Sequence, residues 1–241
     1  MMTNAFPQLS VILPTLNEAI NLPPLLATLT AQQQLNLEII LADGGSRDAT
    51  RRVAARHPIK WVEGPAGRGR QMNQGAALAR GALLFFLHAD SRLPAGFDRV
   101  IRRTLDATHV AAGAFSLGID ADGQKMRMVE YWANLRSRFL GMPYGDQGLF
   151  LKAARFHQGG GFPELPIMED FAMMQHLRKT GRIVTVPERI YTSPRRWRRL
   201  GVLRTTLTNQ AIIAGYLLGV PADRLSRWYR RSRRLDQPRR P

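Results

Sequence analysis

Two carboxylate side chains stand close after apolar runs of this sequence. Asp43 follows the run 37–42, and Asp90 follows the run 83–87 with His88 two residues before it. A carboxylate accepts hydrogen bonds from hydroxyl or imide groups, and it binds hard divalent cations that take their remaining ligands from phosphate and water. These positions suggest a base or ribose contact at Asp43 and a metal–diphosphate contact at Asp90. A plain turn at Asp43 and a cap at Asp90 remain as alternatives.

A glycine-rich basic loop, residues 64–70 (GPAGRGR), precedes a helical pattern. Backbone amides at a helix start and the planar guanidinium of Arg68 both favour phosphate, while Gly67 permits a close backbone approach. The loop lacks the Gly-Lys-Ser/Thr of a Walker A sequence and has no dinucleotide fingerprint. We therefore expect a phosphate-binding loop, with a passive linker as the alternative.

Two further polar clusters stand beside apolar segments. Residues 14–18 (PTLNE) end the first apolar run, and Glu169-Asp170 opens a helical pattern. The first is also explained as a helix entry capped by asparagine, and the second as compensation of a helix dipole. Beside a diphosphate and a metal, one acid of the second pair would instead take the proton of an attacking hydroxyl.

The elements around these clusters alternate. Apolar strands at 9–13, 37–42, 59–62 and 83–87 alternate with helical patterns at 21–30, 47–56 (capped by Ser46) and 71–80. This order predicts an α/β fold with a mostly parallel, doubly wound, Rossmann-like sheet. Ligands bind outside the carboxyl ends of such strands. The clusters described above are therefore expected along one edge of the sheet.

The second half changes character. It shows strands at 111–117, 183–186 and 189–192, helices at 125–139 and 168–179, and a glycine-rich passage at 141–161. We expect α+β material laid against the first half. The predicted organisation is one domain, 8–200, with a nucleotide-binding half (8–95) and an acceptor half (96–200), followed by a basic helical C-terminal tail, 201–241.

Composition narrows the class of protein. Thirty-five Lys and Arg against 18 Asp and Glu give a formal charge of +17, which attracts phosphates, anionic lipid or nucleic acid. Cysteine is absent, and the N-terminus does not have the pattern of a secretion signal. The longest apolar stretch, about 200–220, is interrupted by polar residues and falls short of the roughly 20 apolar residues that cross a bilayer. A cytoplasmic protein is expected, with peripheral contact at the inner face of the membrane as an extension.

Taken in order, PTLNE, DGGS, GRGRQMN, HAD and MED resemble the family 2 glycosyltransferases, which have the GT-A fold. The resemblance spans roughly residues 8–200. It is strongest to the small bacterial branch described as arsenosugar-biosynthesis or radical-SAM-associated glycosyltransferases. It implies an inverting transfer of a sugar from a UDP- or GDP-sugar to an acceptor hydroxyl, assisted by Mn²⁺ or Mg²⁺.

The resemblance also assigns roles to residues. Asp170 matches the general base, and Asp90 matches the last acid of the family's Asp-x-Asp metal motif. His88 replaces the first acid, and is either a nitrogen ligand or a strand-end side chain. The residues expected to bind the nucleotide sugar are Pro14, Thr15, Glu18, Asp43, Gly67, Arg68 and Asp90. Those expected on the acceptor side are Asp146, Glu169, Arg196 and Trp197.

Other interpretations remain open. A sugar-1-phosphate nucleotidyltransferase would carry its glycine-rich loop directly after the first strand, where this chain has PTLNE. A non-enzymatic nucleic-acid- or membrane-binding protein is suggested by charge alone, and no reading module with interleaved aromatics accompanies it. The segment 200–218, flanked by arginines, either packs on the domain, forms a dimer contact or lies on an anionic membrane.

Overall fold

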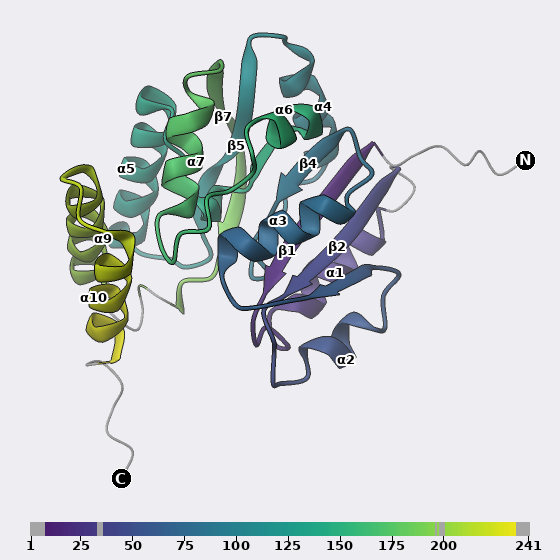
Figure 1. The fold of residues 1–241 in the computed structure, drawn as a ribbon, viewed down its shortest axis with the longest axis horizontal. Coiled ribbons are helices and arrows are strands. Elements are labelled where there is room, and N and C mark those ends of the chain that lie inside the picture. Colours follow the sequence, from purple (N-terminus) through teal and green to yellow (C-terminus); the bar gives the residue numbers. More distant parts are fainter. Residues whose placement is uncertain (1–7, 33–35, 196, 198–200, 235–241) are drawn as a thin grey trace, which may run out of the picture.

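The computed structural model describes residues 8–32, 36–195, 197 and 201–234. Its centre is one seven-stranded sheet in the order β3-β2-β1-β4-β6-β5-β7 (Figure 1). Neighbouring strands pair in parallel except at β6, which is antiparallel to both β4 and β5. The predicted mostly parallel α/β sheet is therefore confirmed. The strands are β1 (Leu9–Thr15), β2 (Leu37–Asp43), β3 (Lys60–Glu63), β4 (Leu83–Phe86), β5 (Val110–Ile119), β6 (Leu149–Lys152) and β7 (Arg182–Thr192).

Two apolar cores lie on the two faces of this sheet. Alternate residues of a strand point to opposite faces, so Val11 and Leu13 of β1 join one core while Ile12 joins the other. Helices α1 (Leu22–Thr30), α2 (Thr50–Ala54) and α4 (Phe97–Asp106) supply the first core. Helices α3 (Arg68–Leu78), α6 (Ala153–Gln158) and α7 (Glu169–Leu177) supply the second.

Local sequence explains several of these elements. Helix α1 starts after Asn21 and has prolines at its second and third positions, within the first turn, where a missing N–H costs little. Helix α3 lies close against β1 because Gly75 has no side chain: a Cβ there would stand 2.5 Å from the Ile12 side chain. That close packing fixes the direction in which the start of α3 meets the sheet edge.

The second half extends the same sheet. Helix α5 (Gln124–Leu140) packs on β5 through buried Asn134, which hydrogen-bonds both backbone groups of Leu117. A 3₁₀ turn, η2 (Gly145–Gln147), leads into β6. The predicted strands 183–186 and 189–192 form one strand, β7, because an irregularity opposite Phe115 and Ser116 keeps the pairing continuous. The sequence interpretation did not identify β6, α4 and α6.

Two helical boundaries differ from expectation. The predicted helix 47–56 with a Ser46 cap is wrong: α2 is only Thr50–Ala54, and Ser46 instead hydrogen-bonds Asp43. Helix α3 begins at Arg68 rather than at residue 71. The basic loop is therefore partly helical, and Arg68 lies in the first turn of α3.

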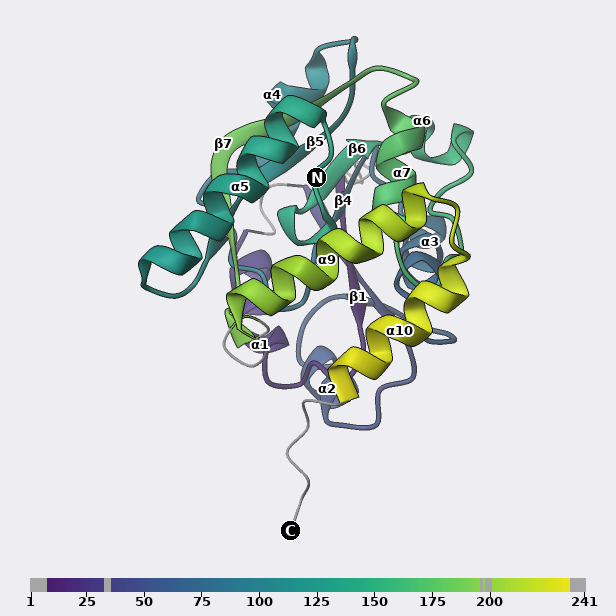
Figure 2. The same ribbon diagram turned by 90° about the vertical axis from the view of Figure 1, so that its left-hand side faces the viewer.

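The C-terminal helices α9 (Val202–Leu217) and α10 (Ala222–Arg234) form a hairpin (Figure 2). Ile212 and Leu225 are buried in the second core, so the expected packing of this segment on the domain is confirmed. Among the described residues, no helix is both long enough and apolar enough to span a bilayer.

Candidate active site

A large cavity opens at the carboxyl ends of the strands. Its volume is about 890 Å³, within the range of sites that hold small molecules and cofactors. It is bordered by segments from both halves of the chain and by the C-terminal hairpin. The predicted site residues that line it are Pro14, Glu18, Arg68, His88, Asp90, Asp146, Glu169, Asp170 and Trp197.

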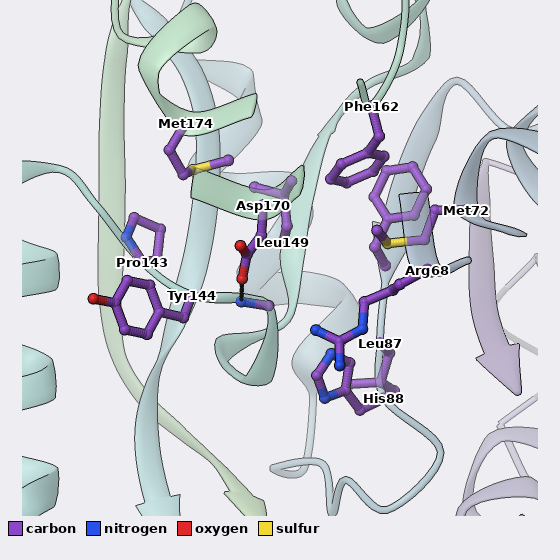
Figure 3. A pocket seen from close by; sticks show the side chains of 12 residues that line it. Arg68, Met72, Leu87, His88, Pro143, Tyr144, Leu149, Phe162, Asp170 and Met174 are labelled. Carbon is purple, nitrogen blue, oxygen red and sulfur yellow. Dashed lines mark hydrogen bonds between the residues drawn. The ribbon is translucent and has the colours of Figure 1, made fainter. Parts of the chain in front are cut away.

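Three chemically distinct groups converge at Gly145. A Cβ built on Gly145 would lie 3.2 Å from His88 Nε2, 3.4 Å from Asp170 Oδ2 and 3.8 Å from Arg68 Nη1. Figure 3 shows the guanidinium of Arg68 beside the His88 ring, and Asp170 directed at the backbone of the η2 turn. These residues come from α3, the end of β4 and α7. The fold therefore brings a carboxylate, a guanidinium and an imidazole from three distant segments to one point.

Asp170 is held by backbone groups. Its Oδ2 accepts a hydrogen bond of 2.9 Å from Gly145 N, and its Oδ1 accepts one of 2.7 Å from Phe171 N. A carboxylate has about four acceptor positions. Asp170 therefore keeps acceptor capacity toward the cavity while its orientation is fixed.

The neighbouring Glu169 forms a buried counterpart to Arg68. Its Oε1 lies 3.5 Å from Arg68 Nη1, and only 7% of its side chain is exposed. Burial raises the pKa of Glu169; Arg68 opposes this, and adjacent Asp170 adds to it. Desolvation lowers the pKa of Arg68, but the negative charges of Glu169 and Asp170 outweigh it and raise that pKa overall. Arg68 is thus a fixed cation at the cavity wall.

His88 is neutral in this arrangement. Burial, together with the adjacent cation of Arg68, lowers the pKa of His88 to about 3. The small pocket that His88 borders is largely apolar, and Met72, Phe86 and Leu149 also line it. A neutral imidazole is the form that donates a lone pair to a metal.

The backbone just before the acidic pair is unusual. Met168 has a left-handed conformation with φ of 71°, which is uncommon for a side chain other than Gly, Asn or Asp. It is buried in the second core, which holds it there. Strained residues of this kind cluster at functional sites. Here the strained residue sets the entry of α7, and with it the positions of Glu169 and Asp170.

The loops after β1 and β2 form a separate, self-contained unit. Asp43 is 1% exposed and accepts hydrogen bonds from Thr15 Oγ1 (3.1 Å), Gly45 N (2.9 Å) and both N and Oγ of Ser46 (2.7 and 2.6 Å). Asn17 ties the two loops together, because its N–H donates to Ser46 Oγ and its Oδ1 accepts from Arg47 N.

This unit lies beside the cavity rather than in its wall. Thr15, Asp43 and Gly67 are absent from the cavity lining, although they were expected to bind the nucleotide. Four hydrogen bonds use the acceptor capacity of the Asp43 carboxylate. The simple-turn interpretation therefore accounts for Asp43 as the structure places it, and its contact with a nucleotide stays a prediction.

Asp90 and Glu18 face each other across Arg195. Nη2 of Arg195 lies 3.4 Å from Asp90 Oδ2 and 3.8 Å from Glu18 Oε2. Among the described residues, no group of three or more His, Asp or Glu side chains is arranged to hold a metal ion. A cation at Asp90 would therefore have few protein ligands, the situation in which phosphates and water complete the coordination.

Sequence analysis missed the residues that brace the site. Gln71 is buried and donates from Nε2 to the carbonyls of Thr15 (2.7 Å) and Ala42 (2.9 Å), which joins α3 to β1 and β2. Asn73 bonds both backbone groups of Phe162. Both lie in the GRGRQMN motif, so amides spaced two apart in a helix start were the available signal. Nothing local in the sequence points to Gly145.

Three of the four residues predicted on the acceptor side are found in the cavity lining. Asp146, Glu169 and Trp197 line the cavity, whereas Arg196 lies outside the described residues. The C-terminal hairpin adds a wall that was not expected as part of the site. The lining residues from α9 and α10 are Asn209, Ile212, Ile213, Ser226, Tyr229 and Arg230.

Comparison with known proteins finds glycosyltransferases. The chain is 38% identical over 96 residues to the PGL/p-HBAD biosynthesis glycosyltransferase of Mycobacterium tuberculosis, and a Mycobacterium bovis protein of the same name matches equally. The match spans 37% of this chain and 38% of each relative. Less than two-fifths of each relative is therefore matched.

Solved structures match over more of the chain. TarS from S. aureus superposes with a TM-score of 0.63 at 20% identity, over 78% of this chain and 61% of TarS. The mannosyltransferase PcManGT from Pyrobaculum calidifontis, solved with GDP-Man and Mn²⁺, superposes with a TM-score of 0.63 at 21% identity, over 87% of this chain and 65% of that one. At such identities the likeness concerns the fold, and it confirms the expected GT-A architecture.

The family follows from a third comparison, because it covers more than half of the chain. The model of glycosyl transferase family 2 matches residues 10–157, which run from β1 through the cavity-lining η2 turn into α6. The chain belongs to glycosyl transferase family 2.

Proposed function

We propose that this protein transfers a sugar from a nucleoside-diphosphate donor to an acceptor hydroxyl in one inverting displacement, with Asp170 as the general base. The observation that supports this most is the convergence of Arg68, His88 and Asp170 around Gly145, beside Asp90 in one cavity. A single displacement needs one base and one stabilised leaving group. In this proposal Asp170 supplies the base, and Arg68 stabilises the leaving group.

Asp170 suits the role of base because two backbone N–H groups orient it and leave it acceptor capacity. The acceptor hydroxyl would donate its hydrogen bond to this carboxylate, which would take the proton as the oxygen attacks the anomeric carbon. Glu169, the other member of the pair, is buried against Arg68 and serves to hold that cation in place.

Arg68 suits the departing diphosphate. It lies in the first turn of α3 and lines the cavity, and both a guanidinium and a helix start favour phosphate. Asp90, with His88 near it, would hold a divalent cation whose other ligands are diphosphate and water. When bound, such a cation would offset negative charge on the leaving group. Arg195 would have to release Asp90 for this, which costs little because 59% of the Arg195 side chain is exposed and the pair meets through one nitrogen, at 3.4 Å.

The donor is a UDP- or GDP-sugar in this proposal. The support comes from relatives of the same fold: TarS is solved with UDP and with UDP-GlcNAc, and PcManGT with GDP-Man and Mn²⁺. The acceptor hydroxyl would approach from the side of Asp146, Trp197 and the α9–α10 hairpin. This assignment keeps 8–200 as the transferase domain and 201–241 as a tail, whose helices α9 and α10 complete the cavity wall.

Calorimetric titration of UDP- and GDP-sugars, with and without Mn²⁺, tests the proposal. We expect Mn²⁺-dependent binding of one donor, which Asp90→Ala abolishes because the cation loses its carboxylate ligand. Asp106→Ala is the matched control: this exposed acid at the end of α4 is distant from the cavity lining, and its variant should bind like the parent. Unchanged Mn²⁺-dependent titration of Asp90→Ala would contradict the assignment.

A further inference from the structure

Helix α5 has its polar and apolar faces reversed. Its buried residues are Glu130, Asn134 and Ser137, which bond to the backbone and side chains of β5 and β7. Its opposite face is apolar and open to solvent. The exposed apolar residues of α5 are Met128 (54%), Tyr131 (61%), Trp132 (60%), Phe139 (79%) and Leu140 (57%). A surface helix normally turns its polar face outward, so this outer face is suited to an apolar environment.

Helix α9 also exposes apolar side chains, but its inner side differs from that of α5. It packs inward through Thr205 and Ile212. Residues at helical spacing on the other side, Leu203, Leu207 and Leu218, are 73%, 60% and 84% exposed. Ala211 and Ala214 complete this exposed stripe, and Arg204 is the one charged residue of the helix. An apolar stripe therefore runs along the outer side of α9, with the exposed residues Arg204, Thr206 and Gln210 beside it.

Helix α10 adds charge beside this stripe. Leu225 and Ser226 face inward. Arg224, Arg227 and Arg231, spaced by three and four residues, are exposed on the same helix, and Trp228 among them is 46% exposed. Asp223, in the first turn, is the one acidic residue of α10. Apart from Asp223, the large exposed side chains described on α10 are thus basic or aromatic.

The three helices form one side of the molecule. In Figure 1 α5, α9 and α10 lie together at the left, and Figure 2 shows all three facing the viewer in one layer. Of the 13 large apolar side chains exposed among the described residues, ten lie on these three helices or at the residue that caps α9. An exposed apolar area concentrated on one side marks an interaction surface. We call it the three-helix surface.

We propose that the three-helix surface docks the protein on an anionic lipid bilayer. Leucines and aromatic rings beside arginines are the composition that inserts shallowly into the interface of charged membranes. The arginines of α10 match anionic headgroups, a complementarity that a second copy of this equally basic chain would not provide. The proposal is independent of the transfer chemistry, because none of the exposed residues named on this surface lines the cavity.

The cavity lies directly behind the part of the three-helix surface that α9 and α10 form. The inner sides of α9 and α10 line the cavity while their outer sides form the three-helix surface. Docking would therefore place the cavity one helix layer away from the lipid headgroups. That arrangement suits an acceptor carried by a lipid, a point that additionally depends on the proposed transferase function.

Vesicle flotation tests the docking. The full chain should float with phosphatidylcholine vesicles containing 30% phosphatidylglycerol at 0.1 M NaCl, and at least about tenfold less with pure phosphatidylcholine or at 0.5 M NaCl. Arg224→Gln with Arg227→Gln should weaken binding about 25-fold, at about fivefold per arginine. Leu207→Gln with Leu218→Gln should weaken it at least about tenfold. The matched control pair, Ile20→Gln with Leu78→Gln, replaces exposed apolar side chains elsewhere and should leave flotation unchanged.

Other outcomes would overturn the proposal. Flotation that is equal on neutral and charged vesicles, or that falls equally in the control pair, would exclude docking through this surface. So would an absence of flotation together with a dimer, seen by light scattering, that the Leu207 and Leu218 changes dissociate, because a second copy would then cover the surface. Circular dichroism of each variant verifies the fold, so a loss of binding is not confused with unfolding.

Discussion

Asp43 and Asp170 are both acids near the ligand edge of the sheet, yet the structure uses them differently. Asp43 is buried and receives four hydrogen bonds from its own turn and from Thr15. Asp170 receives two backbone hydrogen bonds and borders the cavity beside Arg68. The difference teaches that a carboxylate at a sheet edge stabilises the fold when the adjacent turn satisfies it, and remains available for chemistry when it is only oriented.

The largest expected effect is on turnover, and it comes from substitution of Asp170 in the cavity. Asp170→Asn should lower the turnover number about 1000-fold, because it removes the proton acceptor and keeps the shape. Donor affinity should stay within about twofold, because Asp170 faces the acceptor in the proposal. Single-turnover transfer and donor titration measure the two quantities separately. Near-normal turnover of this variant, with turnover lost in Glu169→Gln, would mean that the adjacent acid is the base.

Substitution of Asp43 should lower the stability of the protein and leave its turnover nearly unchanged. Asp43→Ala should lower the free energy of unfolding by about 3 kcal/mol, because a buried carboxylate and several of its donors lose their partners. The turnover of the folded fraction should change little. Urea unfolding followed by fluorescence measures the loss, and Ser46→Ala, which removes one donor, should cost about 1 kcal/mol. If stability is unchanged and donor affinity falls, Asp43 contacts the nucleotide as the family resemblance implied.

A smaller expected effect is the dependence of stability on pH that arises from His88, beside Asp170 in the cavity. Because the pKa of His88 is lowered to about 3, the unfolded chain binds a proton near pH 6.5 that the folded chain does not bind. Stability is therefore full above pH 6.5 and falls as the pH decreases toward 3. We expect His88 to contribute a loss of about 1 kcal/mol at pH 5.5 relative to pH 7.5. Urea unfolding at both pH values should show this loss in the parent and not in His88→Gln. An equal loss in both proteins would place the titration elsewhere.

Much of the first half was predictable because its signals are local. Apolar runs that end at polar turns placed β1, β2, β3 and β4 within about two residues, and alternation with helices indicated parallel pairing. The boundary errors also have local causes. Strand β1 continues through Pro14 to Thr15 although Pro14 cannot donate a hydrogen bond, and Arg68 joins α3 without a side-chain cap.

The second half was harder to predict because its elements depend on distant partners. Strand β6 is four residues long and is recognisable as a strand through its antiparallel pairing with β4 and β5. Helix α5 buries polar residues and exposes apolar ones, so a hydrophobic pattern assigns its faces wrongly. The hairpin of α9 and α10 became part of the cavity wall only through its packing on the second core.

The sequence by itself determined the fold class, the family and the acids and arginine from which a site could be chosen, because strand periodicity, turn residues and motif order are written in neighbouring positions. Only the tertiary structure decided which of these acidic and basic side chains lie close together. Gly145 shows why: it is 77 residues from Arg68 in the sequence, yet a Cβ built on it would lie 3.8 Å from Arg68 Nη1. Burial, hydrogen-bond saturation and shifts of pKa are properties of surroundings assembled from distant segments, and these surroundings separate Asp43 from Asp170.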